Sequence, residues 1–294
     1  MKVAIYGQYY QNSTEPIIRD IFSFFNSNGF EIAIASEFME VLHDRQLVPG
    51  DYPTFSTTDE LRKGFDLFVS IGGDGTILRA AAMVGDTGIP IVGINAGRLG
   101  FLANVQKDNI EEFFRFIIDG KHIISKRALL SLTCEPEIEP VAELNFAMNE
   151  ISVSRKDSAS MITIETYLNG EYLTSYWADG LIISTPTGST GYSLSCGGPI
   201  LTPDVNSLVV TPIAPHNLNA RPLVIPDTTE IKLRVTGREE QYHVSLDSRT
   251  ASVLNETVLT ISKTPFHINM IEIPGQSFLK TLRTKLLWGE DKRN

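Results

Sequence analysis

The sequence has few of the features that mark metal-binding, membrane-spanning or nucleic-acid-binding proteins. Its 294 residues include only two cysteines, Cys134 and Cys196, with no CxxC pair, so we expect two reduced, buried thiols. No apolar run reaches the roughly 18 residues that a membrane helix needs. The net charge of −10 argues against a nucleic-acid or anionic-membrane partner. The N-terminal stretch turns polar after six residues, which is unlike a signal peptide and favours a cytoplasmic location.

Common nucleotide-binding and metal-binding patterns are also missing. The sequence contains no GxxxxGK[ST], which excludes a Walker-type phosphate loop. Gly73 and Gly75 begin a GxGxxG, but Leu78 stands where the third glycine belongs, so a dehydrogenase fingerprint is weak. None of the five histidines has a second ligand at metal spacing, so we predict no metal-ligating side chains, although His216 lies close to a candidate site residue, Ala214.

The most informative stretch is FDLFVSIGGDGTILR at 65–79. An apolar run with β-branched residues breaks at Gly72-Gly73-Asp74-Gly75-Thr76 and resumes with good helix formers, which predicts a strand, a glycine turn and a helix. Glycines let backbone N–H groups approach an anion, and a helix start favours negative charge. Asp74 would repel a phosphate there unless it binds a metal or takes a proton, so its presence suggests chemistry.

The chain changes character after Gly120. Before it, strands alternate with helices, which predicts a parallel sheet. After it, many strands follow with almost no helical stretches, and Asn169-Gly170 marks a hairpin, which predicts an antiparallel β domain. The residues 277–288 return to helical spacing and are expected to pack on the first domain.

Two further stretches suit a nucleotide. Residues 179–195 combine an apolar strand with a loop of hydroxyl residues and glycines, which offers small donors and close backbone approach; a decorated surface turn remains an alternative. Asn149-Glu150 interrupts an apolar strand, and a carboxylate that accepts from ribose hydroxyls is a recurrent nucleotide contact. A solvent-facing pair at a strand end is the alternative.

Together, these stretches resemble one family, the NAD kinases. The resemblance rests on GGDGT at 72–76, NAGRLGFL at 95–102 and Asn149-Glu150-Ile151. It continues with ADGLIISTPTGSTGYSLSCGGPIL at 178–201 and ends with FLKTLRTKLLW at 278–288. The motifs span almost the whole chain in the family's order, whereas GGDGT alone also occurs in related lipid kinases.

The resemblance implies a fold and a reaction. It implies a Rossmann-like α/β domain (1–108 with 276–294) and an antiparallel β-sandwich-like domain (109–275) that binds NAD and forms oligomers, with the active site between them. The expected reaction moves the γ-phosphoryl group of ATP to the 2′-hydroxyl of the adenosine ribose of NAD, giving NADP, with Mg²⁺ required. A homodimer or homotetramer with a shared site is expected. The alternatives are a lipid kinase of the GGDGT class and a non-catalytic NAD-binding sensor.

By position, the resemblance implies that Asp74 is the catalytic carboxylate, which orients the acceptor hydroxyl and takes its proton late. The other residues it implies in ATP or NAD binding are Gly72, Gly73, Gly75, Thr76, Phe101, Asn149, Glu150, Asp179, Thr187, Thr190, Gly191, Tyr192, Ser193, Leu194, Ser195 and Ala214. Arg79, one turn beyond Gly75, is either a phosphate contact or a solvated helix residue.

Three positions depart from the common family pattern. Trp177 stands where arginine is frequent, which removes one cation from the expected phosphate contacts. Gly191 stands where alanine is common and loosens the loop. Arg249 replaces a frequent glutamine, so we expect it to contact a phosphate in place of an amide.

Overall fold

The computed structural model describes residues 1–8, 14–48, 50–97, 100–103, 105, 110–142, 145–156, 160–275 and 277–288. The chain forms two compact units, Met1–Lys126 with Ile268–Asn294 and Arg127–His267. We call them the first and the second unit.

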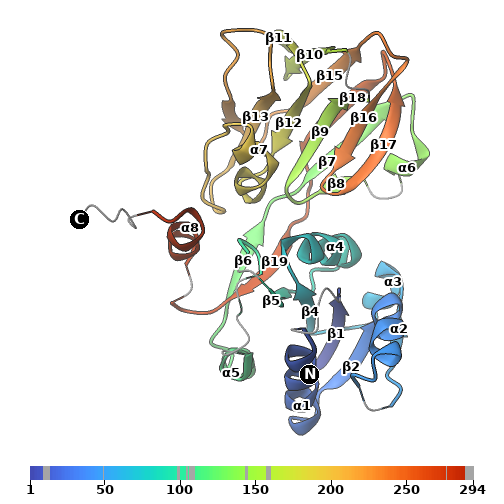
Figure 1. Cartoon of the computed structure of the whole chain (residues 1–294), viewed down its shortest axis with the longest axis vertical. Coiled ribbons are helices and arrows are strands. Elements are labelled where there is room, and N and C mark those ends of the chain that lie inside the picture. Colours follow the sequence, from blue (N-terminus) through green and yellow to red (C-terminus); the bar gives the residue numbers. More distant parts are fainter. Residues whose placement is uncertain are drawn as a thin grey trace. The chain divides into compact units, whose positions relative to one another are not determined.

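The first unit is an α/β domain, as the sequence predicts (Figure 1). Its strands are β1 (Lys2–Gly7), β2 (Glu31–Ala35), β3 (Thr54–Phe55), β4 (Leu67–Gly72), β5 (Ile91–Asn95), β6 (Ile123–Arg127) and β19 (Ile268–Glu272). In the described chain they form one sheet in the order β3-β2-β1-β4-β5-β19-β6. The pairs from β3 to β19 are parallel. The order 3-2-1-4-5 is that of a doubly wound fold.

Helices follow most of these strands. They are α1 (Thr14–Ser27), α2 (Ser36–Asp44), α3 (Thr58–Leu61), α4 (Asp74–Val84), the 3₁₀ turn η1 (Gly85–Thr87), α5 (Ile110–Ile118) and α8 (Phe278–Leu286). Helix α1 buries the apolar face that the sequence predicts, and α8 is helical as expected. Their spacing of apolar residues, at every third or fourth position, is what one buried helix face requires.

The second unit consists of two antiparallel sheets. The strands of one sheet run in the order β11-β10-β15-β18-β7-β8 and those of the other in the order β14-β13-β12-β9-β16-β17. Their bounds are β7 (Leu130–Glu135), β8 (Phe146–Ala147), β9 (Glu150–Arg155), β10 (Ile162–Leu168), β11 (Glu171–Ala178), β12 (Gly180–Ser184), β13 (Ser207–Ile213), β14 (Leu223–Pro226), β15 (Ile231–Thr236), β16 (Gln241–Leu246), β17 (Arg249–Leu254) and β18 (Val258–Lys263). Short helical segments are α6 (Glu139–Ala142), η3 (Thr187–Thr190) and α7 (Tyr192–Ser195).

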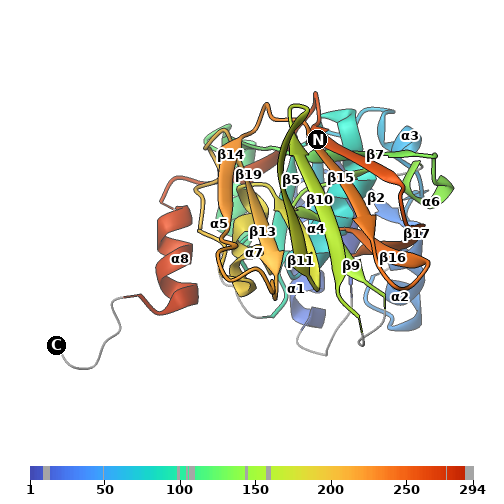
Figure 2. The same ribbon diagram turned by 90° about the horizontal axis from the view of Figure 1, so that it is seen from above.

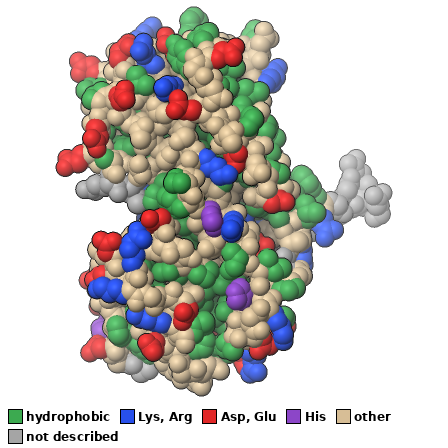
Figure 3. Space-filling model, turned by 180° about the vertical axis from the view of Figure 1, so that it is seen from behind, with side chains coloured by type: hydrophobic (Ala, Val, Ile, Leu, Met, Phe, Trp, Pro, Cys, Tyr) green, Lys and Arg blue, Asp and Glu red, His purple; other side chains and the backbone are tan. Residues whose placement is uncertain are grey.

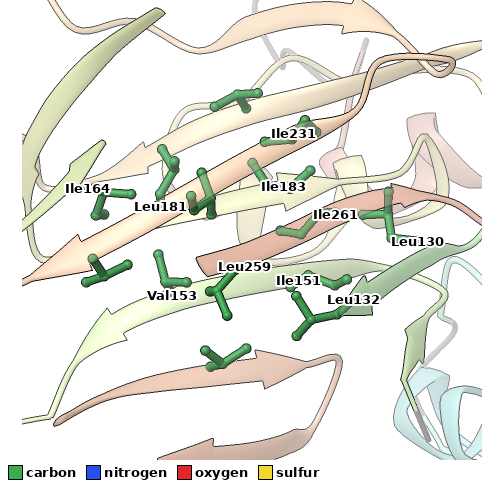
Figure 4. Packing of buried hydrophobic residues seen from close by; sticks show 14 of the residues in the cluster. Leu130, Leu132, Ile151, Val153, Ile164, Leu181, Ile183, Ile231, Leu259 and Ile261 are labelled. Carbon is green, nitrogen blue, oxygen red and sulfur yellow. The ribbon is translucent and has the colours of Figure 1, made fainter. Parts of the chain in front are cut away.

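Both sheets contribute to one apolar core. Figure 4 shows Ile164 of one sheet beside Leu181 of the other, and Leu259 of the first sheet near Val153 and Ile151 of the second; all of them are buried. Alternation along each strand places apolar side chains on this inner face. A β-sandwich is therefore confirmed for this unit.

The predicted hairpin at Asn169-Gly170 is confirmed. Strands β10 and β11 pair in antiparallel register up to Leu168 opposite Glu171 and run side by side in Figure 2. Asn169 and Gly170 both have positive φ, 51° and 82°, as a two-residue type I′ turn requires.

The boundaries of the units differ from those predicted from sequence. Helix α5 lies in the first unit, where Phe114 packs against Phe25 with ring centroids 4.7 Å apart. Strand β19 also lies there, because Met270 pairs with Ile91 of β5. The divisions therefore fall at 126/127 and 267/268 and not at 108 and 276.

The surface mixes charges of both signs. In Figure 3, Lys and Arg side chains lie among Asp and Glu side chains across the face shown. In the part of the chain that the structure describes, no helix is long and apolar enough to cross a membrane. Both cysteines have free thiols, as expected, but they are only partly buried, which corrects the expectation of two buried thiols.

Candidate active site

The glycine turn lies where the sheet of the first unit reverses its order. Strands β1 and β4 are neighbours, and the chain winds outward from them in opposite directions. Gln8 follows β1, and its N–H donates to the Ile71 carbonyl at 3.1 Å. Thr76 Oγ1 donates to Gln8 Oε1 at 3.2 Å, so the two strand ends are joined by side chains as well. Ligands of open α/β sheets bind at such a switch point, beyond the carboxyl ends of the strands.

The structural requirement for glycine differs between the positions of this turn. At Gly72 an added Cβ would collide with Thr76, so the fold itself requires glycine. At Gly73 and Gly75 an added Cβ would meet nothing within 4 Å, and neither has positive φ. Gly75 even lies inside α4, where glycine costs about 1 kcal/mol relative to alanine. Internal packing therefore does not explain these two glycines, whereas close approach of a ligand would explain them.

Asp74 is the first residue of α4, and its carboxylate is already occupied by backbone N–H groups. Oδ2 accepts from Phe101 N–H at 2.8 Å, and Oδ1 accepts from the N–H groups of Leu102 and Ala103, each at 3.0 Å. Gly100 completes the fit, because an added Cβ there would collide with the carboxylate.

These contacts bear on how Asp74 is tolerated at an anion-binding turn. From sequence we expect a metal or a proton to be needed beside a phosphate. The structure adds a third contribution, because three backbone N–H groups point at the carboxylate. A carboxylate offers about four lone-pair positions. Among the described residues, its partners use two positions on Oδ1 and one on Oδ2, so one acceptor position on Oδ2 has no partner there.

Arg79 lies one helical turn beyond Gly75, and Phe101 is joined to the glycine turn because its N–H donates to Asp74. The Phe101 ring is 6.4 Å from that of Phe278, and Lys285 Nζ is 5.9 Å from its centroid, so α8 contacts this segment. The predicted return of the C-terminal helix to the first domain is confirmed. Arg79 is exposed on α4 and makes no hydrogen bond or ion pair with another described residue, so both hypotheses for it stay open.

In the second unit, Asp247 organises the segment that carries Asn149 and Glu150. Its Oδ2 accepts from Met148 N–H at 2.9 Å, and its Oδ1 accepts from the N–H groups of Asn149 and Glu150 at 2.8 and 3.1 Å. The apolar strand that Asn149-Glu150 interrupts is divided here into β8 and β9. Asp247 is not among the residues predicted from sequence, which include only Arg249 of this turn. The signal in the sequence that could have pointed to Asp247 is a carboxylate directly after a strand and before a polar residue, Ser248.

The side chains of Asn149 and Glu150 each leave an oxygen buried. Asn149 Oδ1 and Glu150 Oε2 have no hydrogen-bond partner among the residues that the structure describes. Burial, and then the charge of Asp247, raise the pKa of Glu150 from 4.5 to about 8, while the N–H of Tyr192 acts in the opposite direction. The pKa of Asp247 is raised as well, because burial outweighs the three N–H bonds and Arg249, which lower it. Since Asp247 accepts three N–H groups and Glu150 Oε2 has no partner among the described residues, we assign the charge of this pair to Asp247 and the proton to Glu150.

The segment after β12 wraps around Asn149 and Glu150. Thr185 Oγ1 donates to the Met148 carbonyl at 2.6 Å, and its N–H donates to the Asn149 carbonyl at 2.9 Å. An added Cβ at Gly191 would lie 3.2 Å from Glu150 Oε2 and 3.5 Å from Asn149 Nδ2. Asn149, Glu150, Gly191 and Tyr192, all predicted from sequence, are therefore brought together.

The hydroxyl residues of this segment divide into two groups. Thr190 Oγ1 donates to the Thr187 carbonyl at 3.3 Å, and Ser193 Oγ lies 2.8 Å from Thr211 Oγ1. These hydroxyls stabilise the loop. Tyr192 and Ser195 are exposed and Leu194 is partly buried, so these side chains are more accessible to a ligand.

Three predicted residues have other contacts or lie apart from this group. Asp179 forms an ion pair with Arg155, with Oδ2 and Nη2 3.0 Å apart. Arg249 donates to the Phe146 carbonyl and lies near Asp247, so its guanidinium holds β8 in place in this structure. Ala214 follows β13 with a φ of 43° and is exposed. Their contacts to NAD or a phosphate stay predictions.

Comparison with known proteins identifies the family. The model of the ATP-NAD kinase N-terminal domain matches residues 4–122, and that of the C-terminal domain matches residues 148–273. The chain belongs to the NAD kinase family. An NAD kinase of Flavobacterium johnsoniae is 70% identical over 294 residues, and one of Bacteroides fragilis is 42% identical over 295 residues; in both cases all of each chain is covered.

Solved structures of an NAD kinase and of an NADH kinase have a similar fold. An Archaeoglobus fulgidus NAD kinase in complex with ATP is 25% identical, with a TM-score of 0.75, over 98% of this chain and 99% of that one. A yeast NADH kinase in complex with NADH has a TM-score of 0.89 at 23% identity and covers 100% of this chain and 89% of its own. The second likeness bears on the fold alone.

The raised pKa of Glu150 predicts how stability depends on pH. With a pKa of about 8 when folded and an ordinary value when unfolded, the folded state binds the proton more tightly. The resulting stabilisation is complete below about pH 4 and is lost as the pH rises to about 8. We expect the wild type to lose unfolding free energy relative to Glu150→Gln over that range, measured by chemical denaturation. Exposed Glu171→Gln is the control and should show no such difference; parallel curves for Glu150→Gln would contradict the assignment.

Proposed function

We infer that the chain is an ATP-dependent NAD kinase, which transfers the γ-phosphoryl group of ATP to the 2′-hydroxyl of the adenosine ribose of NAD and forms NADP. The observation that carries this is Asp74, a carboxylate fixed at the start of α4 beside an open glycine turn. Full-length relatives named NAD kinase support the same reaction.

The proposed role of Asp74 is to orient the acceptor hydroxyl. Phosphoryl transfer passes through a loose transition state, so positioning and charge stabilisation matter more than a strong base. Its fixed carboxylate has one acceptor position left on Oδ2 among the described contacts, which suits one hydroxyl. It takes the proton late, when the oxygen–phosphorus bond has largely formed.

The glycine turn is proposed to bind the phosphates of ATP. Gly73 and Gly75 leave room beside the first turn of α4, whose N–H groups and dipole favour an anion. Gly72 and Thr76 shape the turn from inside. Arg79 is exposed one helical turn after Gly75, and we propose that it contacts the same phosphates.

The segment around Asn149 and Glu150 is proposed to bind NAD. The unpartnered oxygens of both side chains are buried and need a polar partner, which ribose hydroxyls or an amide would supply. A protonated Glu150 can donate to such an oxygen as well as accept from a hydroxyl. Gly191 and Tyr192 border these groups.

Mg²⁺ is proposed to enter with the triphosphate. Within the described ranges, no group of three or more His, Cys, Asp or Glu side chains could hold a metal ion, so an all-protein site does not fit. Mg²⁺ in kinase sites is bound by one or two carboxylates together with substrate phosphates and water. When bound, it would reduce the repulsion between Asp74 and the phosphates.

A homodimer or homotetramer in the cytoplasm completes the proposal. Strands β11 and β14 each end a sheet of the second unit. Large apolar side chains are exposed at or beside these edges: Trp177 (57%), Leu218 (90%) and Val224 (45%). Open strand edges with apolar side chains favour association, and a second copy would cover them.

The direct test is NADP formation from ATP, Mg²⁺ and NAD, followed with an NADP-specific dehydrogenase. We expect activity in the wild type and a loss of at least about a hundredfold in Asp74→Asn, which weakens the acceptor and its N–H contacts. Asp86→Asn removes a matched, exposed carboxylate of the same unit and should keep activity. Wild-type activity in a folded Asp74→Asn variant would refute the role of Asp74, and a folded wild type that forms no NADP would refute the function.

Gly75→Ala separates a binding role from a structural one. Because an added Cβ meets nothing and alanine favours helices, we expect the free energy of unfolding to rise by about 0.5–1 kcal/mol. If the turn binds ATP, the KM for ATP rises while the KM for NAD changes little. An unchanged KM for ATP in the more stable variant would show that this position does not approach the phosphates.

A further inference from the structure

The backbone N–H groups of residues 148–150 all point to a single side chain. Between β8 and β9 the N–H groups of Met148, Asn149 and Glu150 all donate to the Asp247 carboxylate, at 2.8–3.1 Å. The contact is reciprocal, because Asp247 N–H donates to the Glu150 carbonyl at 3.0 Å. Asp247 therefore fixes both the position and the direction of this segment.

We propose that Asp247 is a positioning residue for NAD: it fixes the backbone that presents Asn149 and Glu150, and it places a carboxylate beside the Glu150 side chain. This inference rests on the proposed function. Asp247 need not touch NAD, since it acts through the two residues that would. Its own left-handed backbone, with a φ of 51°, turns the chain between β16 and β17 so that the carboxylate faces residues 148–150.

The geometry requires an ionised carboxylate at position 247. One oxygen accepts two N–H groups and the other accepts one, which a carboxylate can do. Asparagine has a single acceptor oxygen, and its NH₂ group would face an N–H donor. Asp247→Asn therefore loses at least one charge-assisted hydrogen bond and leaves a buried donor without a partner.

Several ionisable groups face Glu150, and they come from separate elements. Asp247 approaches from the β16–β17 turn, and Tyr192 and Cys196 approach from α7 and the residue after it. Arg249 of β17 acts on Asp247. Burial contributes most to the raised pKa of Glu150, and the charge of Asp247 comes next. Removing that charge should lower this pKa from about 8 without restoring the ordinary value.

The first test compares the KM values of Asp247→Asn with those of Asp227→Asn. Asp227 is the matched control, because it is also a buried carboxylate of the second unit but forms an ion pair with Lys263. For Asp247→Asn we expect the KM for NAD to rise about tenfold or more, the cost of one lost charge-assisted hydrogen bond, with the KM for ATP nearly constant. Equal changes in both KM values, or equal effects of the two variants, would overturn the proposal.

The second readout is the pH dependence, which a purely structural role would not move. The KM for NAD in the wild type should change around pH 8, where Glu150 titrates. In Asp247→Asn this midpoint should move to lower pH, and in Asp227→Asn it should stay. Asp247→Glu keeps the charge but shifts the oxygens, so it should raise the KM for NAD with a midpoint near that of the wild type. If Asp247→Asn does not fold, the KM for NAD of Asp247→Glu still tests whether the position of the carboxylate matters.

A ligand-free measurement separates this inference from the proposed function. The unfolding free energies of the wild type and Glu150→Gln, compared across pH, report the pKa of Glu150 without any substrate. The same comparison in the Asp247→Asn background shows whether the charge of Asp247 acts on it, and Asp247→Glu, which keeps the charge, is the control. A wild type that forms no NADP refutes the function alone. A titration of Glu150 unaffected by loss of the Asp247 charge refutes the inference whatever the reaction is.

Discussion

A partly buried carboxylate that accepts three consecutive backbone N–H groups is the interaction on which the candidate residues of each unit depend. Asp74 binds the N–H groups of residues 101–103 in the first unit, and Asp247 binds those of residues 148–150 in the second. Neither segment is regular helix or strand throughout, so its N–H groups need another partner. Each such bond to a charged acceptor contributes about 1.5–3 kcal/mol, enough to fix an irregular segment.

The two carboxylates differ in their surroundings. Asp74 lies at the first turn of α4, beside glycines with open space around them, so its remaining acceptor position can meet a substrate. Asp247 lies beside Glu150, and burial together with the charge of Asp247 raises the pKa of Glu150 to about 8, which favours its neutral form. We propose that the same arrangement supports a group that orients a hydroxyl in one unit and a neutral, hydrogen-bonding glutamate in the other.

Local features of the sequence predicted much of the fold. Alternation and helical spacing located most strands and helices, and Asn169-Gly170 located a hairpin, because these signals lie within a few residues. Weak strands were missed. β14 and β17 are sheet edges with much of each strand exposed, so their sequences lack a clear apolar face. β19 was missed too, and with it the boundary of the units, because its pairing with β5 joins distant parts of the chain.

The site was predictable in its residues but not in its contacts. Glycine spacing and the family resemblance pointed to Asp74, Asn149 and Glu150. The partners of these residues lie far away in sequence: Asp247 binds a segment about 98 positions earlier, and Asp74 one about 28 positions later. No local pattern encodes such pairs. For this reason the role of Asp247 and the N–H groups that stabilise Asp74 emerged only from the structure.

Amide hydrogen exchange, resolved to single residues, tests this account most directly. In the wild type, the N–H groups of residues 101–103 and 148–150 should exchange slowly although several lie near the surface. Asp74→Asn should lose protection at 101–103 and keep it at 148–150, and Asp247→Asn should show the reverse. Exchange at either segment that is as slow in its variant as in the wild type would contradict the claim that one carboxylate holds each segment in place.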